Sequence, residues 1–440
     1  MTFKAAVETL DSVRQRLAVE VPAEEVQAEI EKAYAELGRG AKVRGFRPGH
    51  VPRQVLERLF GDRVRGEVFG RLIHQSYAAV IEERHIEALG QPEFVTEQAE
   101  PGAALRYSAT VEVKPEITVE NYRDLEVERP LAVVTEANID AYMERLRQSL
   151  AQLRPITDRQ EVQRGDVVTL DYEATVDGRE VDRAEGREVE IGAAGFPAQF
   201  EERLVGAAVG AELNFAVTQA ADPAAPESPE KTVQFHVRLR GLSQKEVPQL
   251  DDEFAKDHGE CSTLEELRQR VRQQLESDAG RRADEAVRRA LAVRLADTHD
   301  IPVPTALVQG SIEAMIADLM SEWQRRRIQP RNRADAIARL RGELEPQARQ
   351  QVKIALLLEA IARQEGVSVD EHEVDERIEA LAAASGFGAE RVRAAYQSAE
   401  ARRQLRTRLV HARTLEAVAR MARIHTTQRT DSVAEADENG

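Results

Sequence analysis

Apolar and polar positions along the first 115 residues predict an α+β module. Residues 13–21 alternate as in a strand with one buried face, and Pro22 then opens a helix that we expect Gly38 to cap. A loop over residues 39–52 separates it from a second helical stretch, residues 53 to about 89. Strict alternation over residues 105–113 predicts another strand. The apolar positions that define the first strand and helix are Val13, Leu17, Val19, Val21, Val26, Ile30, Tyr34 and Leu37.

The pattern changes twice after this module. Residues 121–150 read as a connector whose second half is an amphipathic helix, with Ile139, Met143 and Leu146 at helical spacing. Short β-like runs then fill residues 166–241, and Asp177-Gly178 between two of them predicts a tight turn. These runs predict a small β-rich domain.

From residue 250 onward the pattern is helical almost to the end. Thr263 and Glu266 form a capping-box pair before a long charged helix, and a further helix begins near Pro304. Residues 371–384 and 390–423 continue the helical pattern, and the polar tail is expected to be disordered. The predicted domains are 1–115 (α+β), 116–155 (connector), 156–245 (β-rich), 246–425 (helical body) and 426–440 (tail).

Composition narrows the class of protein. The 440 residues carry 61 Lys and Arg against 78 Asp and Glu, a net charge of −17, so nucleic-acid contact must be local. Cys261 is the single cysteine, which excludes an internal disulfide and fits a reducing compartment. The sequence shows no apolar run of signal-peptide or membrane-span length, which takes about 18–20 residues. We therefore expect a cytoplasmic protein without membrane contact.

The sharpest local signal is the loop that reads Gly-Phe-Arg-Pro-Gly-His-Val-Pro over residues 45–52. Two glycines and two prolines favour a tight exposed turn that presents Phe46 and Arg47. Residues 39–71 hold nine Lys and Arg against three acids, a local charge of +6. Charge alone leaves two readings equally open: a solvated turn, or a surface for phosphate contacts with one apolar anchor.

The loop resembles the ribosome-docking signature of the trigger factor family. Gly45, Phe46, Arg47, Gly49 and Pro52 match that signature, and Arg44 lies beside it. Where the family commonly has a lysine the chain has Pro48, which removes one cation. The resemblance implies docking on a large-subunit protein and ribosomal RNA beside the exit tunnel. It further implies binding of nascent unfolded polypeptides, and it leaves open a homodimer away from the ribosome.

The β-rich domain resembles FKBP-type prolyl isomerases over residues 166–178 and 200–206. Isomerisation of an X-Pro bond needs a water-poor apolar pocket rather than an acid or base. The resemblance points to Tyr172, Phe200 and Phe235 as the pocket, with Val181 and Phe196 beside them. The first three are also what a small β domain would use as core. We expect weak activity, because Val181 stands where relatives carry phenylalanine and the Ile-Pro-Gly turn before Phe200 is missing.

The resemblance implies a third role, in which the helical body holds client chains. Met315, Ile316, Met320 and Trp323 are the candidate client contacts, although ordinary helix packing is favoured for any single one of them. The full expectation is a multidomain α+β protein with a ribosome-docking domain, an FKBP-like domain and an extended all-helical chaperone body. The chief alternative is a ribosome-bound holdase whose FKBP-like domain has lost catalysis. A free FKBP-type enzyme is the more remote one.

Other chemistry finds little support. His258 and Cys261 have the spacing of half a metal site, but no second pair follows. The sequence carries no Walker loop, dinucleotide fingerprint or nucleophile elbow. We therefore expect no cofactor, no metal and no DNA partner.

Overall fold

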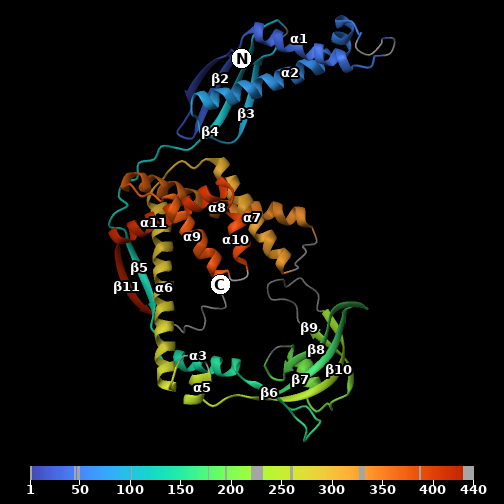
Figure 1. Cartoon of the computed structure of the whole chain (residues 1–440), viewed down its shortest axis with the longest axis vertical. Helices are drawn as coiled ribbons and strands as arrows, with labels where there is room; N and C mark the ends of the chain where they lie inside the picture. Colours follow the sequence, from blue (N-terminus) through green and yellow to red (C-terminus); the bar gives the residue numbers. More distant parts are fainter. Residues whose placement is uncertain are drawn as a thin grey trace. The chain divides into compact units, whose positions relative to one another are not determined.

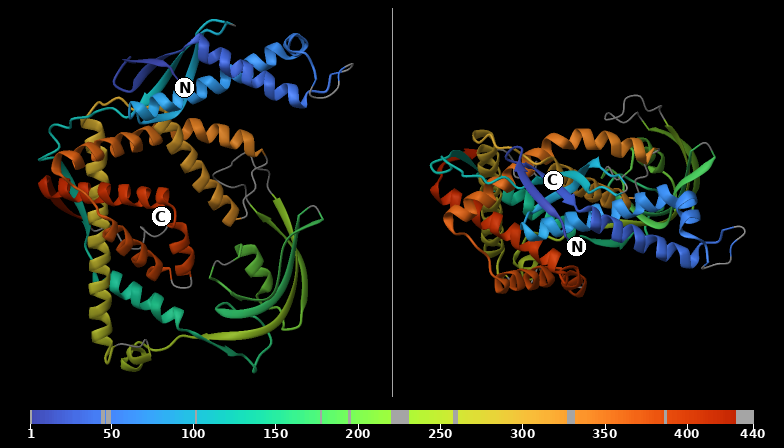
Figure 2. Two further views of the ribbon diagram at one scale, coloured as in Figure 1. Left: turned by 45° about the horizontal axis from the view of Figure 1, so that its top comes forward. Right: turned by 90° about the horizontal axis from the view of Figure 1, so that it is seen from above.

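A computed structural model describes residues 2–43, 46, 50–100, 102–176, 178–193, 196–219, 231–257, 261–326, 332–385 and 388–429. The chain divides into two compact units (Figures 1 and 2). The first unit combines Met1–Pro130 with Asp284–Thr427, and the second is Leu131–Ala283 with Gln428–Gly440. No helix of the described residues is long and apolar enough to cross a membrane.

The N-terminal module is an antiparallel sheet with two helices (Figure 1). Leu17, Val19 and Val21 are almost fully buried, as the alternation predicts. The spatial order of the strands is β1 (Lys4–Thr9), β2 (Arg14–Val21), β4 (Leu105–Val113) and β3 (Ala88–Gln98). The helices are α1 (Ala23–Gly40) and α2 (Arg53–Glu83).

Three details of this module correct the sequence prediction. Helix α1 runs past Gly38 to Gly40, and the N–H of Ala41 closes it by donating to the carbonyl of Leu37 at 2.8 Å. Helix α2 ends at Glu83 rather than near Leu89, because the chain turns there into β3. Strands β1 and β3 escaped prediction, since most of their side chains are exposed and show no apolar alternation.

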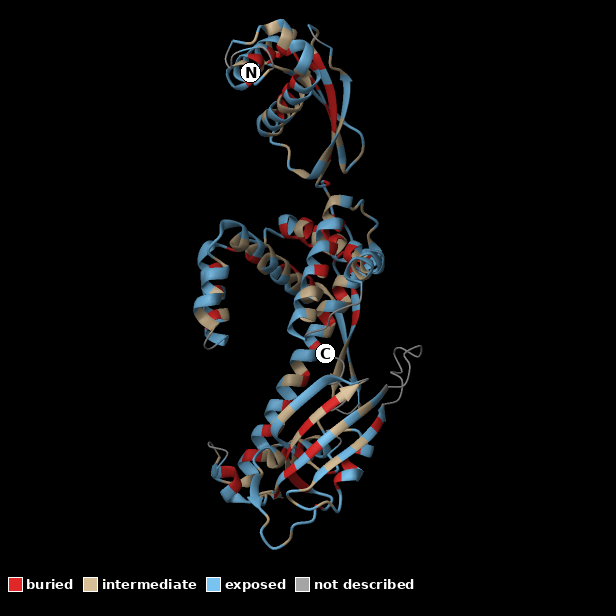
Figure 3. Ribbon diagram, turned by 90° about the vertical axis from the view of Figure 1, so that its right-hand side faces the viewer, coloured by how far each residue is buried: buried red, intermediate tan, exposed pale blue. Residues whose placement is uncertain are grey.

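The second unit contains the β-rich domain. Strand β10 (Lys231–Glu246) lies between β6 (Gln152–Pro155) and β7 (Asp166–Val176), and β9 (Glu212–Gln219) also pairs with it. Strand β8 (Arg179–Glu190) completes the sheet, and helix α4 (Ala198–Leu204) packs its buried residues into the same core. Along β7 buried residues alternate with partly buried ones, whereas β8 is exposed over most of its length (Figure 3). Val176 pairs with Arg179, and Gly178 between them has a φ of 76°, whereas Asp177 of the predicted turn lies outside the described residues.

A buried ion pair fixes the entry to β7. Arg159 donates two hydrogen bonds to Asp166, whose side chain is 6% exposed, and the N–H of Gln163 donates a third at 2.7 Å. Burial by itself would raise the pKa of Asp166, but these bonds outweigh it and leave that pKa below its usual range. The charged carboxylate is therefore the form that the fold stabilises.

Asp166→Asn is expected to lower the free energy of unfolding by about 2 kcal/mol at pH 7. A carboxyl whose pKa is depressed by folding contributes stability above its unfolded pKa, and this contribution disappears as pH falls through the folded value. The difference between the two proteins should therefore shrink below about pH 4. Urea unfolding followed by circular dichroism, at pH 7 and again below about pH 4, measures this difference in the free energy of unfolding. Equal stability of the two proteins at pH 7 would contradict the prediction.

Helices make up most of the remaining chain (Figure 1). Helix α6 begins in the second unit and ends in the first, and α7 and α8 pack against each other through Val308, Ile312 and Val352. In the second unit α3 and α5 pack on the first half of α6. The bounds are α3 (Glu136–Ser149), α5 (Asp252–Asp257), α6 (Leu264–Thr298), α7 (Thr305–Arg325), α8 (Arg333–Glu365), α9 (Glu371–Ala384), α10 (Ala389–Ala395) and α11 (Ala399–Met421).

The end of the chain departs from prediction. The single helix expected over residues 390–423 is two helices, with Ser398 capping the second through a bond from the N–H of Ala401. Strand β11 (Arg423–Arg429) then pairs with β5 (Glu126–Ala132), so residues 426–429 are strand rather than disordered tail. Residues 430–440 lie outside the described part.

The capping box expected at α6 is also different. The N–H of Glu266 does donate to Thr263 Oγ1 at 3.2 Å. The carboxylate of Glu266, however, accepts from the N–H of Ser262 rather than from that of Thr263. The helix start is as predicted, but the reciprocal bond is shifted by one residue.

Candidate functional site

The loop between α1 and α2 lies at one end of this helix pair (Figure 1). Phe46 is 40% exposed, and its N–H donates to the carbonyl of Val43 at 3.0 Å. Pro52 is exposed at the cap of α2. An exposed aromatic ring on a tied backbone is a suitable apolar anchor. The other predicted docking residues, Arg44, Gly45, Arg47 and Gly49, lie outside the described residues.

The structure sorts the cations of this region into two groups. Four arginines of α2 are held by acids of α1 or α2, including Arg53 to Glu31 at 3.4 Å. Arg53 also lies over the ring of Tyr34, 3.3 Å from its centroid, which ties the two helices together. Three exposed cations of the described part have no ion pair: Arg39, Lys42 and Arg58.

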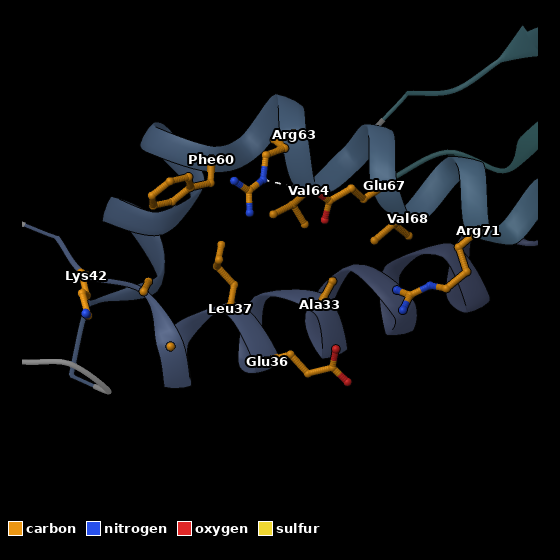
Figure 4. Close-up of a pocket in the computed structure, with 12 residues that line it drawn as sticks. Ala33, Glu36, Leu37, Lys42, Phe60, Arg63, Val64, Glu67, Val68 and Arg71 are labelled. Carbon is orange, nitrogen blue, oxygen red and sulfur yellow. Dashed lines mark ion pairs between the residues drawn. The ribbon is translucent and has the colours of Figure 1, made fainter.

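A groove of about 700 Å³ runs between α1 and α2 (Figure 4). Leu37 of α1 and Phe60 and Val64 of α2 line it with apolar surface. Lys42 lies at its end beside the loop, and the Arg63–Glu67 pair spans 3.2 Å on one rim. The loop is therefore attached to a helix pair that still has apolar surface open to solvent.

Aromatic rings form the centre of the β-rich domain. Phe200 is fully buried, and it stacks on Phe196 at 4.3 Å between centroids and meets the edge of Phe235 at 4.9 Å. Tyr172 contacts Phe196 at 5.5 Å and Phe235 at 6.3 Å. Four of the five predicted pocket residues thus meet in one cluster. We call it the aromatic cluster, and a fifth ring, Phe215, belongs to it.

The sequence analysis did not predict Phe215 as a pocket residue, although an alternating apolar pattern in the sequence includes it. Leu213, Phe215 and Val217 alternate along β9, and strand pairing sets Phe215 opposite Phe235. Val181 lies elsewhere: it is 59% exposed on β8 and does not pack against the aromatic cluster. The chain therefore supplies its ring surface from Phe196 and Phe215 rather than from the position of Val181.

Polar groups border the aromatic cluster on one side. The hydroxyl of Tyr172 donates to Asp182 Oδ2 at 2.6 Å, and Arg187 lies 5.5 Å from the centroid of the Phe196 ring. Burial first, and then Asp182, raises the pKa of Tyr172, so its hydroxyl stays protonated. Apart from that neutral hydroxyl, the cluster offers an apolar surface, as a twisted amide requires.

The candidate client residues are placed unequally. Ile316 is 3% exposed in the α7–α8 core, and Met315 and Met320 are partly buried against that core. Trp323 is partly exposed near the end of α7. Ile316 therefore packs as core, and the other three retain accessible surface. No group of three metal-ligating side chains occurs among the described residues, which do not include His258.

The described elements thus form an α+β module with two long helices, a β-rich domain with an aromatic centre and a helical body, which is the architecture expected for a chaperone of this kind. Comparison with known families agrees. Residues 3–146 match the family described as bacterial trigger factor protein, and residues 263–420 match its C-terminal family. Residues 158–240 match the FKBP-type peptidyl-prolyl cis-trans isomerase family.

Curated relatives extend these matches over nearly the whole chain. The trigger factor of Moorella thermoacetica is 38% identical over 387 residues, which is 86% of this chain and 86% of the relative. That of Anaeromyxobacter dehalogenans is 34% identical over 427 residues, 96% and 100% of the two chains. A solved trigger factor chaperone shares the fold, with a TM-score of 0.54 and 20% identity over 94% of this chain and 99% of its own.

The chain belongs to the trigger factor family. The resemblance inferred from the loop is thereby confirmed, as is the multidomain α+β fold class. The predicted function is also confirmed at the level of a ribosome-associated chaperone with a peptidyl-prolyl isomerase domain. Which residues carry each activity is a separate question.

Proposed function

We propose that the chain docks beside the exit tunnel through the loop 44–52, with Phe46 as apolar anchor and Arg47 as the central cation. The observation that supports this most is the exposed Phe46 ring in the loop that joins α1 to α2. Arg39 of α1, Lys42 of the loop and Arg58 of α2 are exposed and have no ion pair among the described residues. Unpaired cations can neutralise RNA phosphates without breaking internal bonds. The large-subunit protein and the RNA at the tunnel exit are the proposed partners.

Ribosome co-sedimentation tests docking directly. Pelleting of the full chain with ribosomes should weaken as salt rises, because phosphate contacts release counterions. The slope of the logarithm of the ribosome association constant against the logarithm of the salt concentration indicates how many phosphates the chain contacts. Salt-independent pelleting would assign docking to apolar contacts alone.

We propose further that the aromatic cluster is the isomerase pocket and that its activity is low. Tyr172, Phe196, Phe200 and Phe235 supply apolar surface, but Val181 adds nothing to it. A less enclosed pocket stabilises the twisted amide less, and about 1.4 kcal/mol of barrier is already tenfold in rate. If the full chain docks on ribosomes but shows no isomerase activity, the alternative of a ribosome-bound holdase with an inactive FKBP-like domain is favoured.

Holding of client chains is assigned to the helical body in the cytoplasm, with Met315, Met320 and Trp323 as contacts. Their accessible apolar surface on α7 suits varied partners, and methionine adapts to different side chains. Ile316 supports them from the core rather than touching clients.

Deleting the FKBP-like insertion should leave much of the holding activity. The reason is that the second half of α6 and the helices from α7 to α11 form apolar clusters in the first unit that include no residue of the insertion. The measurement is suppression of aggregation of a refolding client, by light scattering, with the full chain as reference. If the deletion variant is inert while the insertion alone protects the client, the assignment of roles is wrong.

A further inference from the structure

The end of α7 and the start of α8 carry a strongly basic surface that the docking, isomerase and holding assignments leave unused. Residues 322–341 hold seven arginines against two acids, a local charge of +5 in a chain whose net charge is −17. Every cation in this stretch is an arginine, and five of the seven lie in the described part. We give the name α7–α8 tip to Trp323, Arg325, Arg326, Arg333 and Arg339.

The acids of this stretch leave most of its positive charge unbalanced. The two arginines at the end of α7 share one carboxylate, that of Glu322. Asp335 is engaged in the cap of α8, where its carboxylate accepts from the side chain of the capping asparagine at 2.5 Å. Arg333 and Arg339 are exposed and have no ion pair among the described residues. These two arginines can therefore neutralise a phosphate without breaking an internal ion pair.

Trp323 lies beside these cations. Its side chain is partly exposed, and it is not part of the apolar cluster that joins α7 to α8 among the described residues. Trp323 follows Met320 by three residues and precedes Arg326 by three, and residues at this spacing are neighbours on a helix surface. Arg333 reaches the same face from α8, since its Nη2 donates to the sulfur of Met320 at 3.7 Å. Guanidinium groups from both sides of the tip are thus close to an indole ring that the core leaves partly open.

This combination of side chains fits RNA better than other anions. A planar guanidinium binds phosphate oxygens in pairs and also stacks on bases. An aromatic ring binds an unpaired base through its face. An acidic peptide would use the cations but has no base to offer the ring. Because the chain belongs to a family of ribosome-associated chaperones, ribosomal RNA is the polyanion that it meets.

We propose that the α7–α8 tip is a second RNA-binding surface, separate from the loop 44–52, and that it takes an unpaired stretch of ribosomal RNA. Phosphates bind Arg326 and Arg333, and one base stacks on Trp323. The inference does not depend on the docking assigned to the loop 44–52. It shares Trp323 with the proposed client contacts, so bound RNA and a client chain compete for that ring.

Intrinsic fluorescence tests the site directly, because Trp323 is the only tryptophan of the chain. Titration of the full chain at low salt with an oligouridylate of about eight nucleotides should quench this fluorescence, since the stacked base contacts the indole. The chain with Phe46→Ala and Arg47→Ala should show the same quench. If anisotropy of a labelled oligouridylate detects binding but the tryptophan is not quenched, the RNA binds elsewhere and the proposal is overturned.

Substitutions at the tip test the two kinds of contact separately. Arg333→Gln is expected to weaken oligouridylate binding about tenfold, as for loss of a charge-assisted contact, and to lower the salt slope by about one. The matched control is Arg363→Gln, which removes an exposed arginine without an ion pair among the described residues, about 45 Å further along α8, and should change the affinity less than about twofold. Trp323→Ala should weaken binding roughly tenfold by anisotropy, whereas Trp323→Phe should keep most of the affinity.

Equal weakening by Arg333→Gln and Arg363→Gln would overturn the proposal in favour of a general effect of charge. Equal affinity for an oligoglutamate of the same net charge would also overturn it, because the tip would then be a site for acidic peptides. Ribosomes should displace the labelled oligouridylate from the chain with Phe46→Ala and Arg47→Ala. Failure of ribosomes to do so would exclude ribosomal RNA as the ligand of the tip.

Discussion

Replacing Phe46 and Arg47 together with alanine is expected to lower ribosome affinity about a hundredfold, a loss of about 2.7 kcal/mol. Phe46 is an exposed ring whose backbone is tied to Val43, so alanine removes the anchor without removing core. Arg47 supplies the charge beside it. Co-sedimentation with ribosomes at fixed salt measures the loss, and circular dichroism checks that the fold is intact.

The control for this experiment uses the difference between cations that are held in ion pairs and cations that have none. Arg65→Ala removes an arginine that is already paired with Asp62 on α2, and it should leave pelleting nearly unchanged. Lys42→Ala and Arg58→Ala, which remove unpaired cations, should each reduce the salt slope by about one. Undiminished pelleting of the Phe46–Arg47 double variant would remove the loop from the docking site.

Phe235→Ala is expected to reduce prolyl isomerase activity to the uncatalysed rate, a loss of about tenfold or more. Phe235 contacts Tyr172, Phe200 and Phe215, so its removal opens the aromatic cluster to water. It is only partly buried, and the domain should therefore tolerate the change better than loss of the fully buried Phe200. A protease-coupled assay on an X-Pro peptide, with the full chain, gives the rate.

Val205→Ala is the matched control, because Val205 is 41% exposed and lies outside the aromatic cluster. It should keep the activity of the parent chain. Activity of the parent at the level of ordinary FKBP enzymes would show that Phe196 and Phe215 compensate fully for Val181. Unchanged activity of Phe235→Ala would place the pocket elsewhere in the domain.

Local patterns were enough to predict most elements that have a strongly apolar face. Leu17, Val19 and Val21 alternate because a half-buried strand has a period of two, and the structure buries all three. Helix α7 begins after Pro304 and α6 after Thr263, where the proline and capping signals predicted them. Strands β3, β5 and β11 carry mixed or polar side chains, so only pairing with a neighbour makes them strands.

The sequence by itself determined the order of the modules, since hydrophobic periodicity is local. The docking signature and the class of isomerase domain came from the resemblance of short motifs to known families. The tertiary structure decided which charges and rings are available. It paired Arg53 with Glu31 across two helices while leaving Lys42 unpaired, and it brought Phe215 to Phe235 while leaving Val181 in solvent. Such contacts join residues far apart in the chain, and their partners are fixed by packing rather than by periodicity.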